Sequence, residues 1–286
     1  MASKIGRALT GQVLKRLGGM RDRRLKRIMA SLIRHAHDFV RETELTEAEW
    51  FEAVQFLTRT GQKCDDKRQE YILLSDVLGV SMLVDEIAHR HAGGATESTV
   101  LGPFYVGGQG FLPRGASIVK RGGGAPTIVS GRVTSTAGKP IKGAVLDVWQ
   151  AAPDGLYDVQ QPQLPPNLRA KFRTDGEGRF EFRTVKPASY PVPTDGPVGL
   201  LLRQMGRHPY RPAHIHFIVS AKGFQPVTTH LFVRGDKYLQ SDVVFGVKNA
   251  LIVDFVRHAS AWEAARLKTR APFYTLAYDF RLKPAR

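Results

Sequence analysis

Two histidines spaced two positions apart, His214 and His216, are the residues of this sequence best suited to bind a metal ion. Their neighbours Ile215, Phe217, Ile218 and Val219 are β-branched or aromatic, which is typical of a β-strand. Side chains at positions i and i+2 of a strand point to the same face, so both imidazoles would project side by side from a rigid element. Such a pair is a good start for a metal site. The alternative is that both are surface strand residues.

Two tyrosines in predicted loops could add ligands to this pair. Tyr157 follows a turn at Asp154-Gly155, and Tyr190 precedes Pro191 in a segment that proline holds extended. A phenol has a pKa of about 10, so a hard, highly charged cation is needed to displace its proton at neutral pH. Two phenolates with two imidazoles would therefore favour Fe(III) over Zn(II) or Fe(II). The alternative is that both tyrosines only pack against the fold.

The elements that must position these residues fall into a helical part and a β-rich part. Apolar residues recur at helical spacing near residues 25–33, after Thr46, and in a long segment over 67–91. Gly93-Gly94 interrupts this pattern, and the glycine-rich residues 106–124 indicate a loop or linker. Beyond them the period becomes two. Strands are predicted over residues 127–135, 144–151, 179–185, 214–221, 227–233 and 273–280, with one further helix over 242–258.

Short strands separated by regular turns favour a β-sandwich. We therefore predict an α+β, mainly β chain of two domains. A helical domain would cover residues 1–105, and a β-sandwich domain that carries the candidate iron site would cover residues 106–286.

Composition narrows the class of protein. The single cysteine, Cys64, excludes an internal disulfide framework and cysteine-rich metal sites, and it fits a reducing cytosol, so a cytoplasmic location is expected. The sequence has no apolar run long enough to span a membrane and no visible secretory signal.

The formal net charge of +16 is concentrated near the N-terminus, where residues 1–34 hold ten lysines and arginines against one acid, Asp22. This segment could contact nucleic acid or anionic lipid, or it could be a solvated helix face. No nucleic-acid motif follows it, so no specific nucleic acid is expected as a partner. A mitochondrial presequence would be rich in serine, and this segment is not.

An ordered set of motifs makes the chain resemble the intradiol ring-cleaving dioxygenases, and most of all their hydroxyquinol 1,2-dioxygenase branch. The motifs are LDVWQA at 146–151, DGLY at 154–157, DGPVG at 195–199, GRH at 206–208 and RPAHIH at 211–216. The resemblance extends from about residue 69 to residue 255. It implies non-haem Fe(III) held by Tyr157, Tyr190, His214 and His216.

The resemblance also implies catalytic roles. The family tyrosine that matches Tyr190 leaves the metal when the substrate chelates it, and the arginine that matches Arg211 stabilises negative charge on the bound substrate. A guanidinium suits that role because it stays charged. His230 stands where the catechol branch carries a glutamine, fourteen residues after the second histidine ligand. Histidine at this position fits the hydroxyquinol branch, with a buried structural histidine as the alternative.

The family's substrate pocket is lined from the helical segment and nearby loops. The matching positions are Leu73, Asp76, Val100, Gly102, Pro103, Phe104, Val192 and Pro193. Asp76 could accept a hydrogen bond from the third hydroxyl of a benzenetriol, whereas it would be left unpaired against the apolar ring of catechol. A helix-surface or capping role is the alternative for this acid.

We therefore predict cleavage of hydroxyquinol (1,2,4-trihydroxybenzene) by both atoms of O2 to 3-hydroxy-cis,cis-muconate, which tautomerises to maleylacetate. Catechol or chlorocatechol is the alternative substrate within the class. A non-enzymatic β-sandwich binding module and a binder of anionic surfaces are the alternatives outside it. Family members are usually homodimers built on the N-terminal helices with lipid between them, and the resemblance implies the same here.

Overall fold

A computed structural model describes residues 6–66, 68–90, 93–161 and 163–285. The chain divides into two compact units, Met1–Gln62 and Lys63–Arg286. The boundary expected after residue 105 stays a prediction.

The first unit is helical, as the sequence predicts. It contains α1 (Arg7–Lys15), η1 (Arg16–Gly19), α2 (Arg23–Thr43) and α3 (Glu47–Gln62). The expected cap of α3 is present, because the Thr46 backbone N–H donates to Glu49 Oε2 at 2.9 Å and the Glu49 N–H donates to Thr46 Oγ1 at 3.3 Å. The short α1 was not predicted from the sequence.

The single long helix predicted over residues 67–91 is two helices, α4 (Glu70–Val77) and α5 (Val80–His89). Its predicted end positions, Lys67 and His91, lie outside the described residues. Gly79 separates the two helices with a φ of 75°, a left-handed conformation that glycine adopts without strain. The division matters for function because α4 carries two of the predicted pocket residues.

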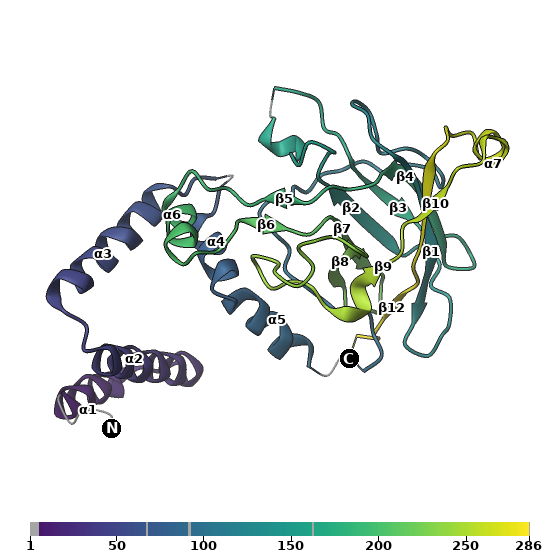
Figure 1. Ribbon diagram of the computed structural model, residues 1–286. Coiled ribbons are helices and arrows are strands. Elements are labelled where there is room, and N and C mark those ends of the chain that lie inside the picture. Colours follow the sequence, from purple (N-terminus) through teal and green to yellow (C-terminus); the bar gives the residue numbers. More distant parts are fainter. Residues whose placement is uncertain (1–5, 67, 91–92, 162, 286) are drawn as a thin grey trace. The chain divides into compact units, whose positions relative to one another are not determined.

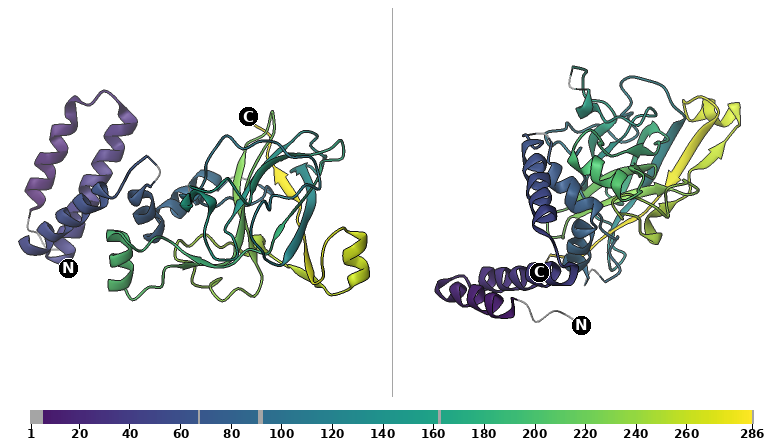
Figure 2. Two further views of the ribbon diagram at one scale, coloured as in Figure 1. Left: turned by 90° about the horizontal axis from the view of Figure 1, so that it is seen from above. Right: turned by 60° about the vertical axis from the view of Figure 1, so that its left-hand side comes forward.

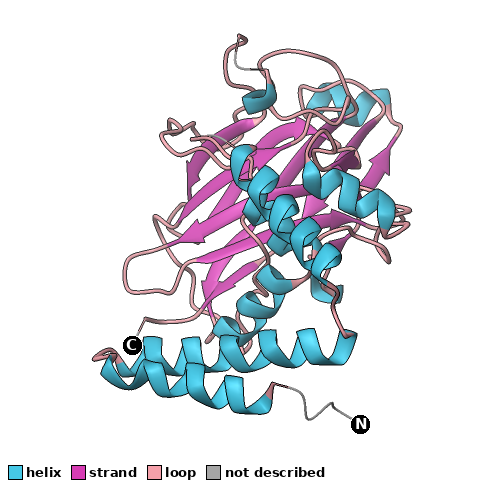
Figure 3. Cartoon of the chain, turned by 90° about the vertical axis from the view of Figure 1, so that its left-hand side faces the viewer, coloured by secondary structure: helices cyan, strands magenta, loops and turns pink. Residues whose placement is uncertain are grey.

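The second unit is built around two five-stranded sheets (Figures 1 and 3). One sheet has the order β10-β11-β1-β12, with β4 also paired to β1, and the other has the order β3-β2-β7-β8-β9. The first contains β1 (Pro126–Ser135), β4 (Arg179–Val185), β10 (Val256–His258), β11 (Phe273–Ala277) and β12 (Phe280–Leu282). The second contains β2 (Val145–Gln150), β3 (Arg169–Arg173), β7 (His214–Ser220), β8 (Val227–Val233) and β9 (Ile252–Val253).

Smaller elements complete this unit. They are the strand pair β5 (Tyr190–Pro191) and β6 (Tyr210–Arg211), the helices α6 (Pro197–Gln204) and α7 (Ala261–Arg266), and the 3-10 turns η2 (Asp158–Gln160) and η3 (Asn249–Leu251). Figure 2 shows α6 and α7 at opposite ends of the sheets. Residues 106–124 contain no helix or strand, as expected for a loop.

The core lies between the two sheets, which confirms the β-sandwich. Ile215, Phe217 and Val219 of β7 belong to one buried cluster with residues of the opposite sheet, and the Phe182 and Phe217 rings lie 6.2 Å apart across it. Because side chains alternate along a strand, His214 and His216 project from the other face of β7. The sandwich core therefore fixes the strand while leaving both imidazoles free for a site.

The helix predicted over residues 242–258 is wrong. This segment forms a turn, η3 and the short strands β9 and β10. The Asp242 carboxylate accepts hydrogen bonds from the backbone N–H groups of Val244 and Gly246, and Phe245 has a φ of 58°. Such local side-chain bonds compete with a helix, and the β-branched residues nearby favour strands.

Among the described residues, the helices are all too short or too polar to cross a bilayer.

Candidate active site

His214 and His216 form the centre of the candidate site. Each is only 1% exposed, so they are not the surface strand residues of the alternative interpretation. Their Nε2 atoms lie 3.0 Å apart. The His214 Nδ1–H donates to the Pro212 carbonyl at 2.7 Å, which leaves the lone pair of His214 Nε2 directed at the site.

The two predicted tyrosines lie beside these histidines. Tyr157 Oη is 2.8 Å from His216 Nε2, and the ring centroids of Tyr157 and Tyr190 are 5.1 Å apart. The Tyr190 ring lies 5.5 Å from that of His214. Both tyrosines are buried, at 1% and 2% exposure. The structure therefore brings together the four side chains that the sequence analysis selected.

The donor atoms fit a metal ion. Metal–nitrogen bonds of about 2.1 Å at right angles place two ligand atoms about 3.0 Å apart, close to the separations of His216 Nε2 from His214 Nε2 and from Tyr157 Oη. Burial lowers the pKa of both imidazoles, with the Arg211 charge adding to the effect, so they are neutral and can donate lone pairs.

The phenols, unlike the imidazoles, must lose a proton before they can bind a metal ion. Burial raises the pKa of Tyr157 well above its usual value, and the neighbouring Tyr190 raises it further. Burial also raises the pKa of Tyr190, although Arg211 opposes this. Without a strong cation both phenols stay protonated at neutral pH. As metal ligands they therefore require a highly charged ion.

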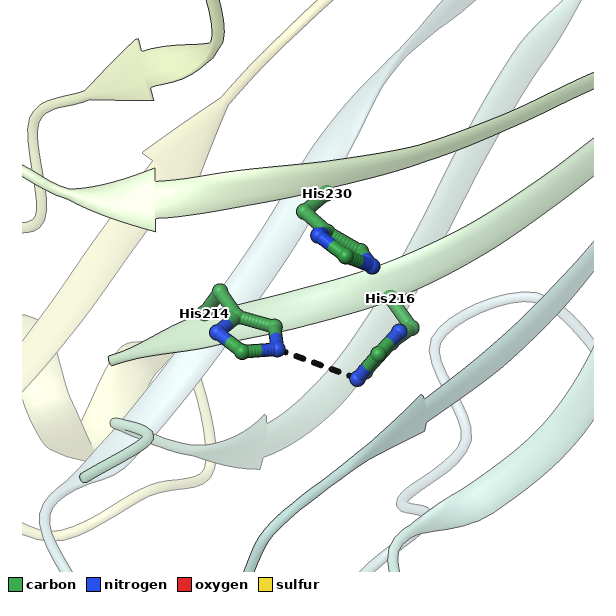
Figure 4. A group of neighbouring side chains, drawn as sticks. All are labelled: His214, His216 and His230. Atoms are coloured by element: carbon green, nitrogen blue, oxygen red, sulfur yellow. Dashed lines mark hydrogen bonds between the residues drawn. The ribbon is translucent and has the colours of Figure 1, made fainter. Parts of the chain in front are cut away.

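A third histidine, His230 of β8, joins the cluster. It lies opposite His216 in the strand register, and their ring centroids are 4.2 Å apart. Figure 4 shows the two neighbouring strands that present the three imidazoles. Nitrogen atoms of all three lie within 4.8 Å of one another, so the histidines alone could also hold a metal. The sequence analysis selected His230 from its position in the motif pattern and not from any expected contact with His216.

Arg211 is buried against this cluster. Its Nη1 is 3.4 Å from His214 Nε2, and its Nη2 is 3.4 Å from His230 Nδ1. Because arginine can only donate, His230 Nδ1 is the acceptor and its lone pair faces the guanidinium. Burial works against the charge, but Asp242 and the tyrosines raise the pKa of Arg211 above its usual value. A permanent positive charge therefore sits beside the histidines.

Aromatic side chains hold the ligand candidates in place. The Trp149 indole stacks on His216 at 4.6 Å, and the Phe104 ring stacks on Tyr157 at 4.5 Å. Gly102 has a φ of 76°, and a Cβ there would lie 3.4 Å from His216 Cε1. The loop before residue 106 therefore packs closely on the site.

Most of the predicted substrate positions are buried, and two of them, Gly102 and Phe104, contact the cluster directly. Leu73, Asp76, Val100, Phe104 and Val192 are buried. Pro103, Phe104 and Pro193 line a cavity of about 860 Å³, and the Phe104 ring also stacks on Tyr157. Burial raises the pKa of Asp76, whereas its hydrogen bond with Ser81 and the charge of Arg211 lower it. Asp76 is therefore a buried carboxyl group on which the Arg211 charge acts.

Asp242 was not identified from the sequence. It accepts hydrogen bonds from Arg211 Nε and Nη2, both at 3.1 Å, across 31 residues of sequence. Its one local signal is an acid placed before the apolar pair Val243-Val244, within a segment that the sequence predicts to be helical.

Comparisons with known proteins agree with this fold and site. Residues 102–284 match a family model described as Dioxygenase, and residues 22–96 match one described as Catechol dioxygenase N terminus. The chain is 52% identical to hydroxyquinol 1,2-dioxygenase of Rhizobium sp. (strain MTP-10005), over 94% of this chain and 92% of the relative. It is 50% identical to 6-chlorohydroxyquinol 1,2-dioxygenase of Cupriavidus pinatubonensis, over 96% of each chain.

A solved structure is similar over nearly the whole chain. It is hydroxyquinol 1,2-dioxygenase from Pseudomonas putida DLL-E4, with a TM-score of 0.91 and 47% identity over 97% of this chain and 98% of the other. The resemblance found in the motifs thus extends to nearly the whole sequence and to the arrangement of its helices and sheets. The chain belongs to the intradiol ring-cleaving dioxygenases, a family of enzymes.

Proposed function

We propose that this enzyme is a hydroxyquinol 1,2-dioxygenase that depends on Fe(III). It would insert both atoms of O2 into 1,2,4-trihydroxybenzene and form 3-hydroxy-cis,cis-muconate, which tautomerises to maleylacetate. The observation that carries the proposal is the buried set of two phenols and two neutral imidazoles with a guanidinium beside it. The names of the two relatives and the solved structure described above support the substrate.

Tyr157, Tyr190, His214 and His216 would hold the iron. When bound, Fe(III) supplies a Lewis acid and template that draws electron density from a chelated diol. Two phenolates match the charge of Fe(III) better than a set of three neutral histidines does.

The chain's own groups perform the remaining chemistry. The Tyr190 phenolate oxygen takes a proton from one substrate hydroxyl as the diol enters. The positively charged Arg211 guanidinium lies beside the substrate and stabilises the negative charge that develops on its ring. This charge is the carbanion character at the ring carbon that O2 attacks. The neutral His230 accepts a hydrogen bond from Arg211 Nη2 and so helps to hold the guanidinium in place. The aromatic packing of Phe104 excludes water from Tyr157.

Asp76 would select the triol. Its carboxylate is 3% exposed and would accept the third hydroxyl of hydroxyquinol. Catechol has no donor at that position, so the acid would stay without this partner when catechol binds. The sides of the ring would be covered by Leu73, Val100, Gly102, Pro103, Phe104, Val192 and Pro193.

Replacing Asp76 with asparagine should lower the ratio of kcat/KM for hydroxyquinol to that for catechol by about 10- to 100-fold, because hydrogen bonds to charged groups contribute about 1.5–3 kcal/mol. Steady-state oxygen uptake with each diol measures the ratio. Asp85→Asn is the matched control, since Asp85 bonds Lys248 and Ser98 and should keep the wild-type ratio. An unchanged ratio in Asp76→Asn would contradict the assigned role.

We further propose that two copies pair through the N-terminal unit, with lipid between them, and that the enzyme works in the cytoplasm. Leu25, Ile28, Leu32 and Phe39 of α2 are between 44% and 57% exposed, and basic residues that suit a phosphate headgroup lie among them. Light scattering should give twice the mass of the chain, and a single-chain mass would contradict the pairing.

Product analysis tests the proposed function. The iron-loaded enzyme should consume one O2 per hydroxyquinol and yield maleylacetate, with a lower kcat/KM for catechol. Preferred cleavage of catechol to cis,cis-muconate would favour the alternative substrate. No oxygen uptake with either diol would contradict the enzyme assignment proposed for this site.

A further inference from the structure

We propose that Asp242 is a positioning residue that holds the Arg211 guanidinium in its working orientation, and that the turn 242–246 is the device that fixes Asp242. This inference rests on the proposed function, because it assigns a support to the arginine that acts on the bound diol.

The contact between the two side chains is bidentate and buried. Asp242 Oδ1 accepts from Arg211 Nε and Oδ2 accepts from Nη2, both at 3.1 Å. Arg211 is 2% exposed and Asp242 is 5% exposed. Two parallel bonds fix the plane of a guanidinium as well as its place. Since Nε and Nη2 are engaged, Nη1 is the group left to face the site, where it lies 3.4 Å from His214 Nε2.

Asp242 is itself held by the backbone. Its Oδ2 accepts from the Gly246 N–H at 3.0 Å, and its Oδ1 lies 3.4 Å from the Val244 nitrogen that donates to it. The Thr99 hydroxyl donates to the Gly246 carbonyl at 3.2 Å, which ties the turn to the segment before the site loop. These bonds hold the Asp242 carboxylate in one position, so it acts as a fixed acceptor for Arg211.

Gly246 makes room for the guanidinium. A Cβ at this position would lie 2.9 Å from Arg211 Nη2, 3.0 Å from Thr99 Oγ1 and 3.2 Å from Asp242 Oδ2. The first separation is the shortest and is below a normal contact distance, so a side chain at residue 246 would force the guanidinium to shift. The turn thus contributes both the acceptors for the arginine and the space that it occupies.

A second carboxyl group explains why a clamp is useful here. Asp76 is close enough to both charges for Arg211 to lower the pKa of its carboxyl and for Asp242 to raise it. Without Asp242, Asp76 would remain as an acid whose charge acts on the buried guanidinium. This would favour an orientation of Arg211 turned toward the group assigned to the third hydroxyl of the substrate.

The test is the Asp242→Asn variant. It keeps the shape of the side chain but replaces one carboxylate oxygen with an NH2 group, which cannot accept the hydrogen bonds that Arg211 and the backbone donate. We expect kcat for hydroxyquinol to fall about a hundredfold, as for a catalytic group displaced by about 1 Å, with the iron-to-protein ratio unchanged. In an Arg211→Gln background the same substitution should cause no further loss, because Asp242 acts through Arg211. Equal losses in both backgrounds would overturn the proposal.

Asp147→Asn is the matched control. Asp147 is also 5% exposed, and it bonds Lys171 and Tyr105 without touching Arg211. It should lower the thermal midpoint of unfolding about as much as Asp242→Asn while leaving kcat near the wild-type value. A loss of kcat that matches that of Asp242→Asn would show a general effect of removing a buried acid and would overturn the proposal.

Gly246→Ala is a second variant for the case in which Asp242→Asn does not fold. It keeps both charges but crowds the guanidinium together with the Thr99 hydroxyl and the Asp242 carboxylate, so kcat should again fall about a hundredfold with iron retained. Wild-type kcat in Gly246→Ala would overturn the proposal. Wild-type enzyme that turns over no diol would overturn the proposed function and this inference with it, whereas active wild type with fully active variants would overturn this inference alone.

Discussion

Replacing His216 with alanine should give a folded protein that binds no iron and cleaves no diol. His216 Nε2 lies within 3.0 Å of His214 Nε2 and 2.8 Å of Tyr157 Oη, so this nitrogen is shared by the closest donor pairs in the site. The affinity for iron should fall more than about a hundredfold. Even the mutation of a residue that only hydrogen-bonds to a metal ligand typically lowers metal affinity about 10- to 100-fold. Iron per protein chain after reconstitution measures the effect.

Two further variants make this result specific. His258→Ala removes a histidine that bonds Thr275, and it should keep a full complement of iron. Tyr190→Phe should keep some iron but lose most of its turnover, because it removes the oxygen that takes the substrate proton and spares the other three ligands. Full iron in His216→Ala would contradict the ligand assignment, and wild-type turnover in Tyr190→Phe would contradict the proton transfer.

Replacing Arg211 with glutamine should lower kcat for hydroxyquinol by about 10²- to 10³-fold, the usual cost of losing one donor that stabilises a transition-state charge. Iron should stay bound, because Arg211 is not a ligand. The variant should also be less stable by about 3–5 kcal/mol, since Asp242 is left as a buried charge without its partner. Steady-state kinetics, iron content and thermal unfolding measure the three effects.

The double variant Arg211→Gln with Asp242→Asn separates these effects. Removing both charges should restore part of the stability and none of the rate. Arg234→Gln is the control for removing an arginine, because Arg234 pairs with Asp254 on the exposed surface and should keep the wild-type kcat. A wild-type kcat in Arg211→Gln would remove this arginine from the mechanism.

Much of the fold follows from periodicity in the sequence. β4 and β8 have the predicted bounds, and β7 alternates between core residues and histidines as a period of two requires. The segment over residues 242–258 was predicted wrongly because its apolar spacing resembles that of a helix. Its structure is decided by an acid that bonds its own backbone and a distant arginine, and neither contact is visible in the spacing of apolar residues.

The proposed ligand set was accessible from the sequence for a different reason. The His-x-His spacing fixes two imidazoles on one strand face, and the motif resemblance adds Tyr157 and Tyr190. The contact of His230 with His216 required the register of β7 and β8, which pairs these two residues directly. Asp242 also escaped sequence analysis, because its partner Arg211 precedes it by 31 residues and no shared motif links them.

The visible absorption spectrum of the purified protein tests the central claim most directly. Iron held by Tyr157 and Tyr190 should give a tyrosinate-to-Fe(III) charge-transfer band and a red colour. The band should shift to longer wavelength when hydroxyquinol is added without oxygen, at a lower concentration than catechol requires, and it should return when oxygen is admitted. A protein that stays colourless after reconstitution with iron would contradict the proposed site.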